Sequence, residues 1–235
     1  MTRIAGLVVL GLLALGVGVG EALTPSTDQV LLVGDSIMRQ TGPALTRQLG
    51  DGSTVHNEGV NGSGLLTPAF FDWEDQLEES LVRTDPDIVV MLFIGNYTDD
   101  PAEFWATPDG KPIPSVQAPG FASAWGRQVD AAMAAIAESG ARVVLVLPPP
   151  MVTPELQAVV DALRAEYEQV AGDRDFVTLA DAAEAVGGEN GEWVAELPAG
   201  DGSMRPVRVP DTVHLADHGQ RLVASEILQA IRRAT

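Results

Sequence analysis

Residues 29–38 read QVLLVGDSIM, which has the pattern of a strand that leads through a tight turn into a helix. Gln29–Val33 is an apolar run of the kind that forms a buried strand, and the segment that follows, Met38–Leu49, has the pattern of a helix. Gly34 permits a tight turn between the two. Ser36 therefore lies between a strand and the start of a helix, where its hydroxyl is either a helix cap or a nucleophile.

The same alternation of apolar runs and helical segments continues along the chain. The further strands that we expect are Thr54–His56, Asp87–Ile94, Arg142–Leu147 and Phe176–Leu179. The further helices are Trp73–Arg83, Phe121–Ser139, Pro154–Ala171 and Ala216–Arg233. Strands that are apolar throughout and are separated by helices form a parallel sheet that is covered on both faces. The sequence therefore predicts an α/β fold, a single doubly wound (flavodoxin-like) domain of about five parallel strands flanked by helices on both faces.

Two stretches interrupt this alternation. Tyr97–Gly120 is rich in proline, and Gly187–Pro210 is rich in glycine and polar residues. Both are long for connections inside a compact domain, so each is either functional or an ordinary decorated loop. Both follow strands near the carboxyl edge of the expected sheet, where α/β proteins place their sites.

The N-terminal segment has the pattern of an export signal. Ile4–Gly20 is uncharged and apolar, an arginine precedes it, and small residues at Gly20 and Ala22 suit cleavage after Ala22. We expect residues 1–22 to be a signal peptide, or an N-terminal anchor if they are not cleaved. Residues 23–235 would then form the folded domain of a secreted or cell-envelope protein.

Composition narrows the class of partner. The chain has 14 basic and 33 acidic residues, for a formal net charge of −19, and it contains no cysteine. Such a charge repels phosphate backbones and argues against nucleic acid as a partner. Without cysteine there is no disulfide to stabilise the protein outside the cell. We expect a monomer that meets a membrane only through an uncleaved N-terminal segment.

A second candidate patch lies near the C-terminus. Asp211 precedes His214 by three residues, so one turn of chain can bring both side chains together. Asp211 could accept the Nδ1 proton of the imidazole and leave Nε2 to activate a hydroxyl. Two alternatives remain: Asp211 as a helix cap beside a surface histidine, or His214 and His218 as metal ligands. The metal alternative lacks an evident third ligand, and Leu215 stands where the metalloprotease motif has glutamate.

Two further patches follow strands. Asn57–Gly64 (NEGVNGSG) contains three glycines, which allow the backbone to approach another group closely, although no P-loop lysine follows. Gly95 and Asn96 end the most apolar strand, where the asparagine either caps the next turn or aims its amide at a reacting oxygen.

The four patches together resemble the conserved blocks of the SGNH hydrolases, the GDSL esterase superfamily. The blocks fall on Gly34-Asp35-Ser36, on Asn57 with Gly62, on Ile94-Gly95-Asn96-Tyr97 and on Asp211-Thr212-Val213-His214-Leu215. Their order and spacing fit nearly the whole chain after the N-terminal segment. The Gly62-Ser63-Gly64-Leu65 stretch, followed by Phe70-Phe71-Asp72-Trp73, further resembles a poorly characterised bacterial branch of this superfamily.

The resemblance implies a carboxylic ester hydrolase that needs neither metal nor cofactor. Ser36 would be the nucleophile, His214 the general base, and Asp211 the residue that orients the imidazole. The oxyanion hole would consist of the Ser36 and Gly62 N–H groups and the Asn96 side chain, with Gly64 as the alternative to Gly62. Asp35 would be structural. The implied substrates are small-molecule, polysaccharide or lipid O-acyl esters, with acetyl or short acyl groups favoured.

The third block departs from the family pattern. Ile94 replaces its first glycine and Tyr97 replaces its aspartate. These departures leave two alternatives open, an O-acyltransferase of the same type and a non-catalytic module that uses the fold to bind carbohydrate or a surface.

Overall fold

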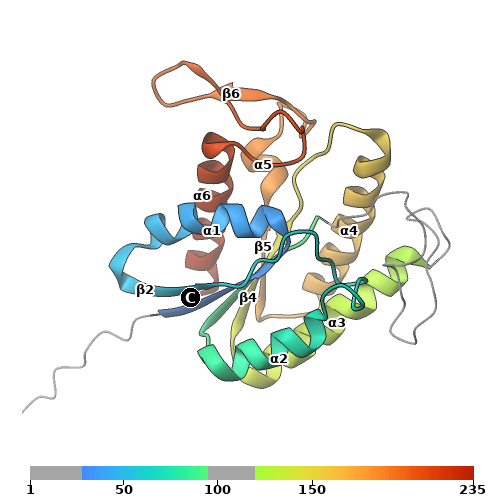
Figure 1. The fold of residues 1–235 in the computed structure, drawn as a ribbon. Coiled ribbons are helices and arrows are strands. Elements are labelled where there is room, and N and C mark those ends of the chain that lie inside the picture. The colour runs from blue at the N-terminus through green and yellow to red at the C-terminus, as the bar shows by residue number, and fades with distance from the viewer. Residues whose placement is uncertain (1–27, 95–119) are drawn as a thin grey trace, which may run out of the picture.

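Five parallel strands in the order β2-β1-β3-β4-β5 form the centre of the protein, in a computed structural model that describes residues 28–94 and 120–235 (Figure 1). The strands are β1 (Asp28–Gly34), β2 (Ser53–Asn57), β3 (Ile88–Leu92), β4 (Arg142–Leu147) and β5 (Val177–Asp181). This is the strand order of the flavodoxin-like doubly wound fold, so the predicted fold class is confirmed. The order reverses between β1 and β3, and open α/β sheets place their binding sites at such a switch point.

Helices cover both faces of the sheet. They are α1 (Ser36–Leu49), α2 (Trp73–Thr84), α3 (Phe121–Ser139), α4 (Pro154–Gly172), α5 (Ala182–Val186) and α6 (Asp217–Ala234), with a short 3-10 helix at Gly50–Gly52. Val30 and Leu32 of β1 pack with α1 and α6, whereas Leu31 and Val33 pack with α2, α3 and α4. Because successive strand residues face opposite sides, burial of both faces makes the strand apolar throughout.

The expected strands and helices within the described residues are all present, with ends that differ by no more than two residues. The Gly187–Pro210 stretch, which interrupts the alternation of strands and helices, has some regular structure of its own. It contains an antiparallel hairpin of β6 (Glu196–Pro198) and β7 (Met204–Pro206), which projects beyond α6 at the top of Figure 1. Strands of three residues are too short to show a periodic pattern, and the five-residue helix α5 was missed for the same reason.

The expected signal peptide or anchor at residues 1–22 lies outside the described residues, as does most of the Tyr97–Gly120 stretch. Within residues 28–94 and 120–235, no helix combines the length and the apolar character needed to cross a bilayer.

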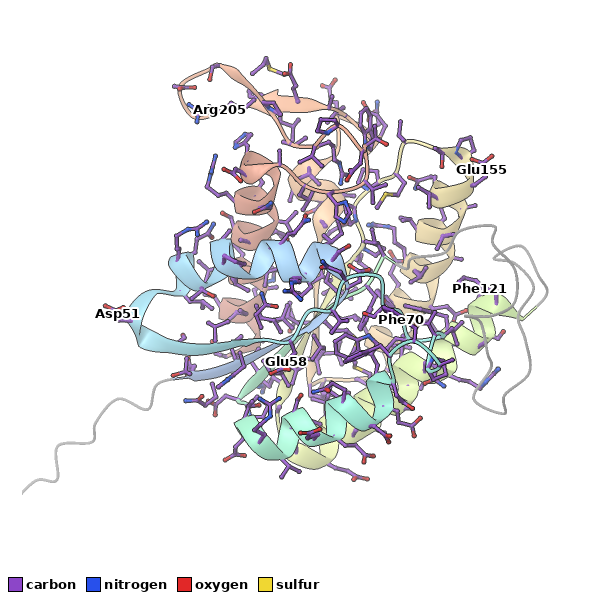
Figure 2. The ribbon with its side chains drawn as sticks, in the orientation of Figure 1. Asp51, Glu58, Phe70, Phe121, Glu155 and Arg205 are labelled. Atoms are coloured by element: carbon purple, nitrogen blue, oxygen red, sulfur yellow. The ribbon has the colours of Figure 1, made fainter. Side chains whose placement is uncertain are left out.

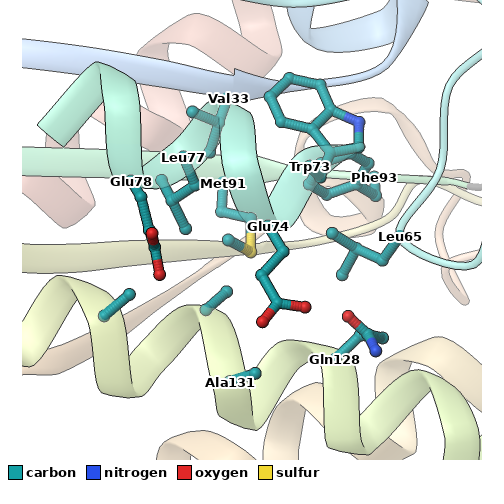
Figure 3. A pocket seen from close by; sticks show the side chains of 12 residues that line it. Val33, Leu65, Trp73, Glu74, Leu77, Glu78, Met91, Phe93, Gln128 and Ala131 are labelled. Atoms are coloured by element: carbon teal, nitrogen blue, oxygen red, sulfur yellow. The ribbon is translucent and has the colours of Figure 1, made fainter. Parts of the chain in front are cut away.

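A small apolar cavity lies between α2 and α3, on the face of the sheet opposite α1 and α6. Its volume is about 60 Å³, and its floor includes Val33, Met91 and Phe93. Figure 3 shows the Glu74 carboxylate between the two helices, close to Gln128. None of Ser36, Asp211 and His214 lines this cavity, so it is separate from the site described next.

Candidate active site

The turn between β1 and α1 brings the backbone of Gly34 against the end of β3. A Cβ atom at position 34 would lie 2.1 Å from the carbonyl oxygen of Leu92. The N–H of Asp35 donates a hydrogen bond to that same oxygen at 3.3 Å. A side chain at position 34 would force β1 and β3 apart, so the glycine sets the path of the chain into Ser36.

Asp35 is fully buried and ties this turn to the residues that follow β3. Its carboxylate accepts hydrogen bonds from the N–H of Ile37 at 2.9 Å and from the N–H of Ile94 at 2.7 Å. Asp35 is thus the N-cap of α1, and Ser36 is the first helical residue. The interpretation of Ser36 as the helix cap is therefore wrong, because its neighbour fills that role and leaves the Ser36 hydroxyl for another partner.

That partner is His214, which lies 178 positions further along the chain. The Ser36 Oγ is 2.9 Å from His214 Nε2, and His214 Nδ1 is 2.7 Å from Asp211 Oδ2. An ionised carboxylate can only accept, so Nδ1 carries the proton and Nε2 is the acceptor that faces the serine hydroxyl. The structure thus brings together the three residues that the two distant patches supply.

Backbone N–H groups hold the Asp211 carboxylate in place. Its Oδ1 accepts from the N–H groups of Val213 and His214, each at 2.9 Å. Burial acts to raise the pKa of Asp211, but the hydrogen bonds from His214 and Val213 outweigh it, and the pKa lies below its ordinary value. The carboxylate therefore stays ionised at neutral pH beside the imidazole.

The Asp211–His214 loop contains an unusual backbone conformation. Thr212 has φ 67°, in the left-handed region that a β-branched residue rarely adopts. The indole N–H of Trp193 donates to the Thr212 carbonyl oxygen at 3.0 Å and holds this turn in place. The sequence could not predict this contact, because nothing in it links Trp193 to a residue 19 positions away.

Arg208 supports the same loop from inside the protein. Its guanidinium donates to the carbonyl oxygens of Val213 at 3.2 Å and of Pro150 at 2.8 Å. The side chain is buried, and burial lowers the pKa of Arg208 to about 10, so the group is still charged at neutral pH. Sequence reasoning missed this residue, because an arginine in a glycine-rich loop looks like any surface arginine.

The glycine-rich loop after β2 offers one of its two candidate N–H donors. The N–H of Gly64 donates to Thr67 Oγ1 at 3.0 Å and is thereby engaged. Gly62 has φ 80°, and among the described residues its N–H has no acceptor. The loop geometry therefore favours Gly62 over Gly64 as a donor to a bound oxyanion. Asn96, the third expected donor, lies outside the described residues.

An aromatic ring stands beside this loop. Phe70 is 51% exposed, and its ring lies 3.7 Å from the position that a Cβ atom of Gly62 would occupy. Figure 2 shows Phe70 in the connection between β2 and α2, far from Arg205 on the hairpin. Phe70 was part of the quoted family resemblance, but the sequence did not place it next to the Gly62 backbone.

The metal alternative finds no support in the geometry of His214, whose two ring nitrogens are engaged by Asp211 and Ser36. In the part of the chain that the structure describes, no three histidine, aspartate or glutamate side chains are grouped so that they could hold a metal ion.

A family model described as "Protein of unknown function (DUF459)" matches residues 29–230. The chain belongs to this family. No curated protein matches the sequence.

Solved structures resemble this DUF459 protein over most of its length. A GDSL-like lipase from Bacteroides thetaiotaomicron is 16% identical, with 89% of this chain and 90% of that chain covered and a TM-score of 0.59. The acetyl xylan esterase AlAXEase is 19% identical, with 86% and 99% covered and a TM-score of 0.59. A carbohydrate esterase family 3 protein from Talaromyces cellulolyticus is 17% identical, with 88% and 100% covered and a TM-score of 0.56. The likeness shows that the DUF459 chain has the SGNH hydrolase fold, as its four blocks predicted.

Proposed function

We propose that this DUF459 protein is a serine ester hydrolase. The observation that carries the proposal is the chain of hydrogen bonds from Ser36 through His214 to Asp211. A hydroxyl, a base and an orienting carboxylate in this order are the parts that nucleophilic acyl transfer needs. The relatives in fold named as lipases and esterases support the same reaction class, although fold alone does not assign a function.

In the first half of the proposed reaction, Ser36 Oγ attacks the ester carbonyl carbon while its proton passes to His214 Nε2. The carbonyl electron pair moves to the oxygen, and the N–H groups of Ser36 and Gly62 stabilise the resulting oxyanion. Ser36 is the first residue of α1, so its N–H has no acceptor within the helix and points out of the positive helix terminus. Collapse of the intermediate expels the alcohol, which takes the proton from Nε2 and leaves an acylated serine.

In the second half, a water molecule attacks the acyl carbon and gives its proton to His214 Nε2. The carboxylic acid leaves as that proton returns to Ser36 Oγ, which restores the resting site. Asp211 keeps its charge throughout and stabilises the imidazolium that forms in each half. The Asn96 side chain is proposed as the third oxyanion donor, from the family resemblance alone.

The test of the activity is hydrolysis of p-nitrophenyl acetate by the wild-type protein and by Ser36→Ala. We expect the variant to lose at least about a thousandfold in kcat/KM, since triad residues act as a unit. Ser139→Ala is the matched control, because this serine is the last residue of α3 and its hydroxyl bonds local backbone, donating to the Ile136 carbonyl at 2.7 Å and accepting from the Ala141 N–H at 3.4 Å. Full activity in Ser36→Ala, or no labelling of Ser36 by a fluorophosphonate probe, would refute the proposal.

We further propose that the acyl group is acetyl or another short chain. Two of the solved structures that share the fold are an acetyl xylan esterase and a carbohydrate esterase. This likeness supports a substrate that carries a small acyl group on a sugar hydroxyl. A series of p-nitrophenyl esters from acetate to palmitate, together with acetylated xylo-oligosaccharides, tests this. We expect kcat/KM to be highest for acetate. A maximum at long chains would instead indicate a lipase, and transfer to an added alcohol in preference to water would indicate an acyltransferase.

A further inference from the structure

Helix α1 contains a proline that removes one of its backbone hydrogen bonds. Pro43 has no N–H, so within the helix the carbonyl oxygen of Arg39, four residues earlier, receives no donor from position 43. The side chain of Asn57, at the end of β2, supplies the missing donor. Its Nδ2 lies 3.1 Å from the Arg39 carbonyl oxygen.

The other end of the same amide holds the glycine-rich loop. The Oδ1 of Asn57 accepts a hydrogen bond from the N–H of Gly59 at 3.1 Å. One side chain therefore connects the second turn of α1 to the loop that follows β2. We call this pair of hydrogen bonds the Asn57 bridge.

Two glycines make room for the bridge. A Cβ atom on Gly42 would lie 2.1 Å from Asn57 Nδ2, and one on Gly59 would lie 2.6 Å from the backbone nitrogen of Arg39. Both distances are far inside van der Waals contact, so a side chain at position 42 would displace the Asn57 amide, and one at position 59 would push the loop away from α1. The sequence thus combines a proline, two glycines and an asparagine at one contact.

The loop fixed by the bridge leads directly to the candidate oxyanion donor. Beyond Gly59, the N–H of Val60 donates to the carbonyl oxygen of Gly34 at 2.9 Å, two residues before the proposed nucleophile. Gly62 follows two residues later. Its N–H and the N–H of Ser36 come from different elements, so their spacing depends on how the loop is attached to α1.

We propose that Asn57 is a positioning residue, which fixes the Gly62 N–H relative to the Ser36 N–H through the Asn57 bridge. This inference rests on the proposed ester hydrolase function and assigns Asn57 no contact with substrate. Oxyanion donors act only when they lie within about 2.7–3.1 Å of the developing charge, and a misplacement of about 1 Å costs about a hundredfold in rate.

The test compares two asparagines of the same loop. Asn57→Ala removes the bridge, whereas Asn61→Ala, the matched control, removes an exposed side chain that makes no hydrogen bond with the described residues. For p-nitrophenyl acetate we expect Asn57→Ala to lower kcat by about tenfold to a hundredfold, since it loosens an oxyanion donor without removing it. The KM should change less than about twofold, because the substrate contacts in the ground state remain. Asn61→Ala should match the wild type.

A second variant separates positioning from general stability. Pro43→Ala restores an N–H that can donate to the Arg39 carbonyl, so in Pro43→Ala/Asn57→Ala the helix is repaired while Gly59 stays untethered. The double variant should regain most of the wild-type melting temperature but keep the kcat defect. Inhibition by a trifluoromethyl ketone, whose bound form carries an oxyanion on the same donors, should weaken by the same factor as kcat/KM.

The experiments distinguish failure of the Asn57 inference from failure of the proposed hydrolase function on which it rests. If the wild-type protein hydrolyses esters and Asn57→Ala is as active as Asn61→Ala, the Asn57 inference is overturned and the hydrolase proposal stands. Recovery of kcat together with stability in the double variant also overturns it, as does failure of both Asn57 variants to fold, since Asn57 would then be structural. If the wild-type protein shows no ester hydrolysis and no labelling of Ser36, the proposed function itself has failed.

Discussion

Substitutions at Asp35 should separate its two structural roles, which are to cap α1 at Ile37 and to accept a hydrogen bond from the N–H of Ile94. In Asp35→Asn the amide oxygen can still accept from Ile37 N–H, because asparagine caps helices about as well as aspartate. The amide nitrogen would then face the N–H of Ile94, so the 2.7 Å hydrogen bond to that residue is lost. A hydrogen bond to a charged, buried acceptor contributes about 1.5–3 kcal/mol, and we expect Asp35→Asn to lose about that much unfolding free energy.

Asp35→Ala should lose both hydrogen bonds. The lost cap adds about 0.5–2 kcal/mol, which brings the expected total to about 2–5 kcal/mol. This is a large part of the roughly 5–15 kcal/mol by which a domain is stable, so the alanine variant should be folded but markedly weaker. Urea unfolding at neutral pH, followed by tryptophan fluorescence and by circular dichroism, measures both losses.

The control for this series is Asp72, the exposed N-cap of α2. Its side chain accepts a hydrogen bond from the Glu74 N–H at 3.0 Å and, within the described residues, makes no hydrogen bond to the sheet. Asp72→Ala should lose only about 1 kcal/mol, and Asp72→Asn close to nothing. If the two Asp35 variants unfold within about 1 kcal/mol of the wild type, the assignment of Asp35 as the link between β3 and α1 is refuted.

Three further results are expected. Gly34→Ala should cost more than about 3 kcal/mol of unfolding free energy in a urea titration, because its Cβ atom would meet the rigid Leu92 carbonyl at 2.1 Å. Trp193→Phe should lower kcat about threefold to tenfold with little change in melting temperature, because it removes the hydrogen bond to Thr212 and keeps an aromatic ring at a position that is only partly buried; an unchanged kcat would show that the turn does not need this hydrogen bond. Since the pKa of Asp211 is lowered by folding, its stabilisation is complete above the unfolded value of about 3.9 and is lost as pH falls through the folded pKa. The stability difference between the wild type and Asp211→Asn should therefore shrink below about pH 4 in acid titrations, and a difference that grows there would contradict this sign.

The fold could be predicted because its signals are local. Arg142–Leu147 has five consecutive apolar residues after its arginine and is followed by prolines, and the structure has a strand with those ends. Gly140 ends α3 in the left-handed conformation, with φ 83°, as glycine commonly does after a helix. Alternation of such segments with helices leaves few arrangements other than a parallel sheet covered on both faces.

The sequence could predict the reacting residues of the site, but not the contacts that hold them in place. Ser36, Asp211 and His214 stand at the ends of elements, where spacing and chemistry single them out. Their supports could not be found in this way, because the Arg208 and Trp193 contacts join loop backbones that no pattern connects. The choice between Gly62 and Gly64 likewise depended on the Thr67 hydroxyl, which accepts a hydrogen bond from the Gly64 N–H.

Because Ser36 and His214 lie 178 positions apart in the sequence, ester hydrolysis also reports on the folding of the chain. Helix formation within α1 or α3 involves only neighbours in the chain, whereas the Ser36–His214 contact requires α6 to dock beside α1 after nearly all of the polypeptide has been ordered. During refolding, helical circular dichroism should therefore return before ester hydrolysis does. A chain that ends before His214 would carry its serine without its base, so catalytic competence is acquired only when nearly the whole polypeptide is present and ordered.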